Sequence, residues 1–155
     1  MTLFKLICCF LLLTQGGIME SINICDSFKE ASSIIIIKEG EEFTLQRGDD
    51  KFELVIKELC KVTENSNEMP AFGVSIDKLT REKKQTGLFI ELDFPCEHWH
   101  NEMNFEALLI EVNKDFSGVN IIRKVNGKYE GRCYYLNLAN TMESLYSAIE
   151  KMSLN

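Results

Sequence analysis

Short runs of apolar residues, separated by turn signals, recur along most of this sequence and constrain its fold more than any other feature. The run 88–94 places four alternate apolar residues on one face: Leu88, Ile90, Leu92 and Phe94. This period of two is typical of a β-strand that packs one face against a core. The dipeptide Asn126-Gly127 predicts a tight hairpin, because a type I′ turn needs positive φ at both central positions. The sequence therefore favours antiparallel β-structure.

Similar patterns predict seven to eight strands. We expect them within residues 33–38, 43–46, 52–57, 72–76, 88–94, 105–112, 119–125 and 129–138. The first run is apolar and β-branched, which is consistent with a strand buried on both faces. Residues 48–50 predict a turn within a hairpin, residues 81–84 a charged hairpin tip, and Pro95 the end of a strand or an edge position. Residues 64–70 are polar and lack periodicity, so we expect a loop there.

The period changes near the C-terminus, where the pattern predicts one packing helix. Asn140 is a suitable N-cap, and Glu143 stands three residues later as its capping-box partner. Apolar residues then recur at spacings of three and four: Met142, Leu145, Tyr146, Ile149 and Met152. This pattern predicts an amphipathic helix of about three turns.

A meander of antiparallel strands followed by one C-terminal packing helix defines a mainly β or α+β fold. Two architectures remain open. One is a barrel or strongly curved sheet with the helix across an open end or side. The other is an α+β sheet with the helix on one face.

The first sixteen residues predict a secretory signal rather than a part of the fold. Lys5 precedes the apolar run 6–13, and Thr14 and Gly16 offer small residues before a cleavage point. The run is too short to span a bilayer, which requires about 20 apolar residues, and no later run approaches that length. We therefore expect removal of residues 1–16, which leaves residues 17–155 as a single extracellular domain. An N-terminal core strand is the alternative.

Four cysteines remain after that removal, and they predict two disulfides. They are spread over the whole domain: Cys25, Cys60, Cys96 and Cys133. An oxidising compartment favours their pairing, but four cysteines allow three connectivities, among which the sequence does not choose.

The charge balance excludes some classes of partner. The formal net charge is −7, and loss of Lys5 with the signal makes it −8. Nucleic acid and anionic lipid both require a basic face, so we expect neither to bind. An acidic domain favours a basic protein partner, with an association that weakens in salt.

One segment concentrates groups that could carry chemistry. An extended backbone would place His98 and His100 on one face, with Cys96 or Glu102 on the same side. Imidazole and carboxylate are zinc or copper ligands, so the pair is a metal candidate; the alternative is a polar loop with Cys96 in a disulfide. Cys96 beside His98 could also form a thiol–imidazole pair, but secretion favours a bridged cysteine. The sequence has no nucleophile elbow and predicts a non-catalytic protein without a cofactor.

These features favour a secreted, non-catalytic binding module that recognises a protein partner through its β-surface or loops. We expect recognition at residues 64–70 and 97–104. Trp99 is the candidate interface residue, because tryptophan is enriched in hot spots; the alternative places Trp99 against the core. A second hypothesis is an extracellular carrier that holds a small apolar ligand inside a β-barrel. A third is a metal-binding protein or metalloenzyme centred on His98 and His100.

Overall fold

The computed structural model describes residues 23–70 and 73–154, so the predicted signal, residues 1–16, lies outside the described part. The helices of this part are α2 (Ile24–Lys29), α3 (Asp50–Thr63), α4 (Asp77–Lys83) and α5 (Glu143–Glu150). Its strands are β1 (Ser33–Lys38), β2 (Glu41–Gln46), β3 (Asn67–Met69), β4 (Val74–Ser75), β5 (Leu88–His100), β6 (Met103–Glu111), β7 (Gly118–Lys124), β8 (Gly131–Arg132) and β9 (Tyr134–Asn137). None of these helices is long and apolar enough to cross a membrane.

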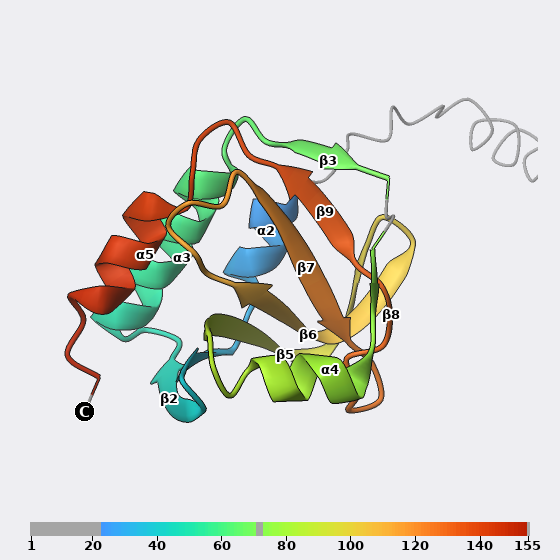
Figure 1. Cartoon of the computed structure of the whole chain (residues 1–155), viewed down its shortest axis with the longest axis horizontal. Helices are drawn as coiled ribbons and strands as arrows, with labels where there is room; N and C mark the ends of the chain where they lie inside the picture. The colour runs from blue at the N-terminus through green and yellow to red at the C-terminus, as the bar shows by residue number, and fades with distance from the viewer. Residues whose placement is uncertain (1–22, 71–72, 155) are drawn as a thin grey trace, which may run out of the picture.

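Seven strands form one antiparallel sheet in the order β2-β1-β5-β6-β7-β9-β3, and β4 pairs separately with β8 (Figure 1). Strands β5, β6 and β7 form a meander. Strand β9 pairs with β7, and β3 lies outside β9. The sheet is not closed, because β2 and β3 are its two edges. The predicted antiparallel fold with a C-terminal helix is thus confirmed in its open, curved form, and the closed barrel is not formed.

Helices α2, α3 and α5 cover one face of the sheet and bury the main core with it (Figure 1). Strand β5 contributes the four alternate residues that the sequence indicated: Leu88, Ile90, Leu92 and Phe94. Burial of each such side chain contributes about 1.5–3 kcal/mol. Helix α5 buries Leu145 and Ile149 and begins at Glu143, with Met142 rather than Asn140 at the N-cap.

Residues 50–63 form helix α3, where the sequence predicted a turn and the strand 52–57. Phe52 and Ile56 are buried as expected, but Leu54 is 40% exposed, and Val55 and Leu59 are buried instead. Burial therefore follows spacings of three and four, which only a helix satisfies. The strand prediction is wrong because residues 52, 54 and 56 alone fit either period.

Several other segments differ from expectation. Strand β5 continues through Pro95 to His100, because its register with β6 shifts after Asp93 and so tolerates a residue without an N–H donor. Residues 81–84 lie at the end of α4 and are no hairpin tip. Part of the expected loop 64–70 forms β3, and the expected strand 129–138 is divided into β8 and β9.

Two local predictions are confirmed. Asn126 and Gly127 have φ values of 50° and 73°, and Val125 pairs with Lys128 across that turn. Strand β1 is buried on both faces: Ile34 and Ile36 join the main core, and Ile37 joins a smaller apolar cluster on the other face.

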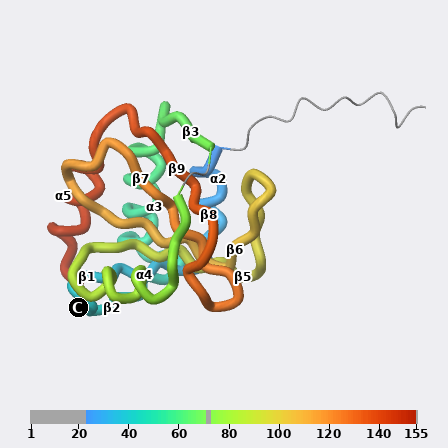
Figure 2. Tube along the Cα trace, turned by 45° about the vertical axis from the view of Figure 1, so that its right-hand side comes forward, coloured from blue at the N-terminus to red at the C-terminus, as the bar shows by residue number. Residues whose placement is uncertain are grey.

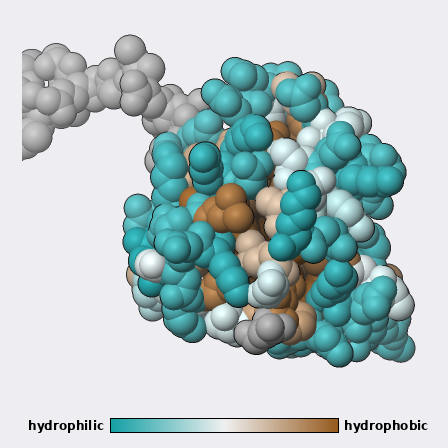
Figure 3. Space-filling model, turned by 90° about the vertical axis from the view of Figure 1, so that its left-hand side faces the viewer, coloured by the Kyte–Doolittle hydropathy of each residue, from teal (hydrophilic) through white to brown (hydrophobic). Residues whose placement is uncertain are grey.

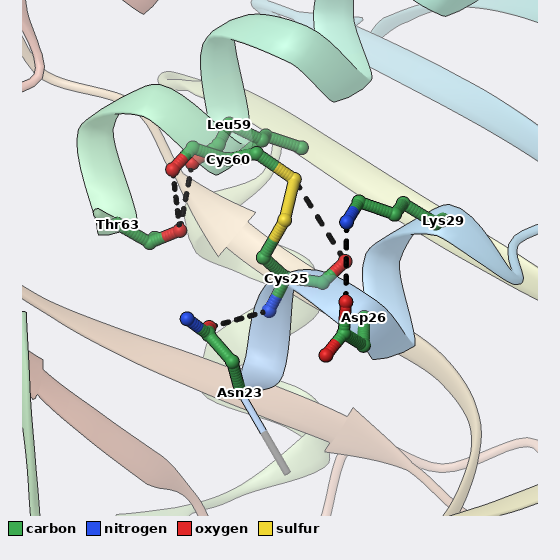
Figure 4. The surroundings of a disulfide bond; sticks show 7 residues. All are labelled: Asn23, Cys25, Asp26, Lys29, Leu59, Cys60 and Thr63. Atoms are coloured by element: carbon green, nitrogen blue, oxygen red, sulfur yellow. Dashed lines mark hydrogen bonds and ion pairs between the residues drawn. A yellow bond between two sulfur atoms is a disulfide. The ribbon is translucent and has the colours of Figure 1, made fainter. Parts of the chain in front are cut away.

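A disulfide joins Cys25 of α2 to Cys60 of α3 across 35 residues of sequence (Figure 4). Closing such a loop stabilises the folded chain by about 4 kcal/mol, because it restricts the unfolded chain. Beside it, the side chain of Asn23 accepts a hydrogen bond from the Cys25 amide at 3.0 Å and caps α2. The second predicted disulfide is wrong: Cys96 is free and exposed on β5, whereas Cys133 is free and buried between β8 and β9.

On the face of the sheet opposite α2, α3 and α5, the carboxylate of Glu91 is buried beneath α4. Lys124 Nζ lies 2.8 Å from Glu91 Oε1, and Lys84 Nζ lies 3.2 Å from Glu91 Oε2. The Tyr129 hydroxyl also donates a hydrogen bond to Glu91. Burial alone would raise the pKa of the Glu91 carboxyl, but the hydrogen bonds from Lys124 and Tyr129 and the charge of Lys84 hold it below its ordinary value. Burial and the bond to Glu91 raise the pKa of Tyr129.

We expect Glu91→Ala to lower the free energy of unfolding by about 3–5 kcal/mol, because Lys84 would stay buried with only the exposed carboxylate of Glu42, 3.8 Å away, as a partner. Glu130→Ala removes an exposed carboxylate nearby and should change the stability by less than about 0.5 kcal/mol. Urea denaturation followed by circular dichroism measures both variants. Equal stability of the two variants would contradict the role given to Glu91.

Candidate functional site

The far end of the β5–β6 hairpin projects from the body of the molecule (Figure 2). His100 and Met103 pair across a two-residue turn, in which Asn101 and Glu102 have φ values of 44° and 63°. Tight hairpins require this conformation, and asparagine favours it. Glutamate disfavours positive φ, so residues 101 and 102 carry no clear sequence signal for a tight turn.

Two hydrogen bonds to the side chain of Glu68 on β3 hold this turn against the edge of the sheet. His100 Nε2 donates a hydrogen bond to Glu68 Oε2 at 2.9 Å, and Asn101 Nδ2 donates one to Oε1 at 2.7 Å. The hydroxyl of Tyr134 donates to the carbonyl oxygens of His100 and Met103 at 2.8 and 2.9 Å. Burial would raise the pKa of the Glu68 carboxyl, but the hydrogen bonds from His100 and Asn101 hold it below its ordinary value.

Residues 64–70 and 97–104 therefore lie side by side, and we call them together the tip surface. The two segments flank a hollow of about 740 Å³, which α2 and β9 also help to line. The sequence nominated both segments as recognition loops, but it did not indicate that they form one surface. The contact between Glu68 and His100 joins them across 32 residues.

The tip surface is acidic and carries an exposed aromatic side chain. Its two segments contain four glutamates and neither lysine nor arginine. Trp99 is 59% exposed, so the alternative that placed it against the core is wrong. A large exposed aromatic residue on a well-fixed hairpin is typical of a binding surface.

The imidazoles of His98 and His100 are engaged in packing contacts. The His98 ring stacks on Phe94 with ring centroids 5.1 Å apart and lies against Phe105. His100 Nε2 is bound to Glu68, and its Nδ1 is buried without a hydrogen-bond partner among the described residues. Neither nitrogen of His100 is thus open to an ion from solvent. Within residues 23–70 and 73–154, no three His, Cys, Asp or Glu side chains are grouped to hold a metal ion.

The two free cysteines in the described part of the chain lie in different surroundings. Cys96 is exposed, and in the described structure no hydrogen bond joins it to His98, so the thiol–imidazole pair is not formed. Cys133 is buried, and burial raises the pKa of its thiol, which keeps the thiol protonated and unreactive.

A second hollow, the α4 groove, lies beside α4 on the other face of the sheet and has a volume of about 440 Å³. Val74, Ile76 and Leu79 line it and are 68%, 56% and 56% exposed. Phe89 and Ile122 of the sheet also line it. The sequence pattern does not indicate this groove, because the neighbouring charged residues 81–84 fit a hairpin tip equally well.

The side of the molecule formed by α3 and α5 presents a narrow strip of apolar atoms between polar side chains (Figure 3). Tyr146 and Met152, of α5 and the residues that follow it, are half-buried and pack against the main core. We therefore interpret this strip as the margin of the core.

Comparison of the chain with protein-family models, with curated proteins and with solved structures finds no match. Function is therefore inferred from the geometry of the chain itself. In the described part of the chain, we consider the tip surface and the α4 groove, because each pairs a hollow with exposed apolar side chains.

The contacts of Glu68 predict a pH-dependent part of the stability. Because folding lowers the pKa of this carboxyl, its contribution is complete above the unfolded pKa, about 4.3, and is lost as the pH falls through the folded pKa. We expect Glu68→Gln to be about 1 kcal/mol less stable than the wild type near about pH 6, and the difference to vanish toward about pH 3. Urea denaturation over this range measures it. A difference that does not change with pH would contradict a charged role for Glu68.

The two free thiols should react at different rates. We expect iodoacetamide to alkylate Cys96 in the native protein, and Cys133 only after unfolding in urea, since one thiol is exposed and the other is buried with a raised pKa. Peptide mass mapping under non-reducing conditions identifies each modified residue. A mapped bond between Cys96 and Cys133 would contradict the arrangement described above.

Proposed function

We propose that this chain is a secreted, non-catalytic binding module that recognises an extracellular protein through the tip surface. One observation carries the proposal: the contact between Glu68 and His100 joins two separate segments into one surface, beside a hollow of about 740 Å³, with Trp99 59% exposed. Interface hot spots are enriched in tryptophan. A protein partner is favoured over a small ligand because the hollow is open at the surface and mixes polar side chains, such as Glu68, Asn101 and Arg132, with apolar ones, as the surfaces of protein interfaces do.

The contacts of the candidate catalytic groups favour a binding role. His98 stacks on Phe94, His100 is buried against Glu68, and Cys133 is enclosed between β8 and β9. A catalytic acid, base or nucleophile must instead reach the reacting atoms of a substrate.

Two features favour an extracellular location. The apolar run 6–13 has the composition of a signal peptide. The disulfide between Cys25 and Cys60 belongs to a class of bond that persists in oxidising compartments. Both features agree with an extracellular partner.

The α4 groove supports a second candidate function, the carriage of a small apolar ligand. An open sheet offers no barrel interior, but this groove has a volume of about 440 Å³ and is lined by three exposed aliphatic side chains. Its volume lies within the range of small-molecule sites. A carrier function would therefore use the groove beside Leu79.

The test of the first proposal compares two variants that each remove an exposed apolar side chain. Trp99→Ala truncates the tip surface, and Leu54→Ala truncates α3 as a control. A partner is first recovered from the extracellular medium by chemical cross-linking and is then purified. We expect Trp99→Ala to weaken its binding about 30-fold, a hot-spot loss of about 2 kcal/mol, and Leu54→Ala to leave it unchanged. Biolayer interferometry measures both dissociation constants.

Two results would contradict this proposal. One is equal affinity of the two variants for the purified partner. The other is recovery of no protein, together with a small apolar molecule that native mass spectrometry detects on the wild type but not on Leu79→Asp. That second result would favour the carrier.

A further inference from the structure

Trp99 lies on the outward face of the hairpin beside a carboxylate. Strand alternation turns His98 and His100 toward the helices and Trp99 away from them. Trp99 pairs directly with Asn104 of β6, and Asn104 Nδ2 donates a hydrogen bond to Glu97 Oε1 at 2.6 Å. The indole, the amide and the carboxylate therefore share one face of the hairpin.

The bond from Asn104 positions the carboxylate of Glu97, which stays exposed to solvent. A positioned carboxylate beside an aromatic ring suits a cation for two reasons. The ring attracts a cation over its face, and the carboxylate accepts hydrogen bonds from it. The arrangement at Trp99 therefore fits a cationic side chain.

The protein builds the same kind of arrangement around the buried ring of Tyr129. Arg81 and Lys84 each lie 5.1 Å from the centroid of the Tyr129 ring, and Glu91 is the accompanying carboxylate. In the described part of the chain, every contact of a cation with an aromatic ring lies at Tyr129. At Trp99 the ring and the carboxylate are present, and the cation has to come from another molecule.

The charge of the tip surface favours the same kind of partner. Residues 64–70 and 97–104 contain four glutamates and neither lysine nor arginine. Such a surface attracts cationic groups and speeds their encounter at low salt.

We propose that Trp99, Glu97 and Asn104 form a recognition site for an arginine side chain of the partner protein. This inference rests on the proposed function and names the chemistry that the same surface recognises. Arginine fits better than lysine, because its planar guanidinium stacks on an aromatic ring while its N–H groups donate to a carboxylate.

Fluorescence reports on this site alone, since Trp99 is the single tryptophan of the chain. The probe is a hexa-arginine peptide, with hexa-lysine and hexa-glutamate peptides for comparison, and all proteins carry Cys96→Ser to prevent disulfide-linked dimers. We expect hexa-arginine to change the Trp99 emission saturably, hexa-lysine to bind more weakly, and hexa-glutamate to have no effect.

Glu97→Gln removes the charge but keeps the oxygen that accepts the hydrogen bond from Asn104. We expect it to weaken hexa-arginine binding about fivefold at low salt. Glu53→Gln is the matched control, because it removes an exposed carboxylate from α3 and changes the net charge equally. The control should bind like the wild type. The charge reversal Glu97→Lys should abolish binding, which provides a second variant if the first is poorly folded.

Equal binding by Glu97→Gln and Glu53→Gln would overturn the arginine site, and so would hexa-arginine without effect on the fluorescence. The proposed function has its own readout. If Trp99→Ala still weakens binding of the natural partner, the tip surface remains the binding site and only the arginine chemistry is wrong. If that variant binds the natural partner normally, the proposed function fails as well.

Discussion

The buried charge of Glu91 is the interaction on which the arrangement of the second face depends. Glu91 lies near the start of β5 and forms ion pairs with Lys84 at the end of α4 and with Lys124 of β7, so one carboxylate positions a helix and a strand. A charge at this depth is tolerated only while its partners are in place, because an unpaired buried charge costs several kcal/mol. Helix α4, held in this way, forms one wall of the α4 groove through Leu79.

The two halves of β5 differ in how they are covered by the rest of the protein. The first half belongs to the scaffold, and the second half belongs to the proposed binding surface. Residues 88–94 are covered on both faces, whereas the strand beyond Pro95 is covered on the helix side only. The inward side of this extension is held by the contact between His100 and Glu68, and its outward side presents Trp99. One continuous strand thus extends from the core to the exposed tip. Such a preorganised surface loses less conformational entropy when it binds.

The sequence predicted those parts of the structure that depend on near neighbours. Alternation over 88–94, the positive φ values of Asn126-Gly127 and the spacing of the C-terminal apolar residues are local properties, and each element is present. The strand over 52–57 failed because a short apolar run fits two periods, and only the packing of α3 against the sheet decides between them. The site was predicted as two separate loops, since the contact of Glu68 with His100 spans 32 residues and leaves no local pattern.

Hydrogen–deuterium exchange of the protein with and without its purified natural partner tests most directly whether the tip surface is the binding site. If the tip surface binds the partner, amide exchange becomes slower on binding in residues 64–70 and 97–104 and stays unchanged in α4. Slower exchange confined to residues 73–83, which border the α4 groove, with none at the tip, would contradict it.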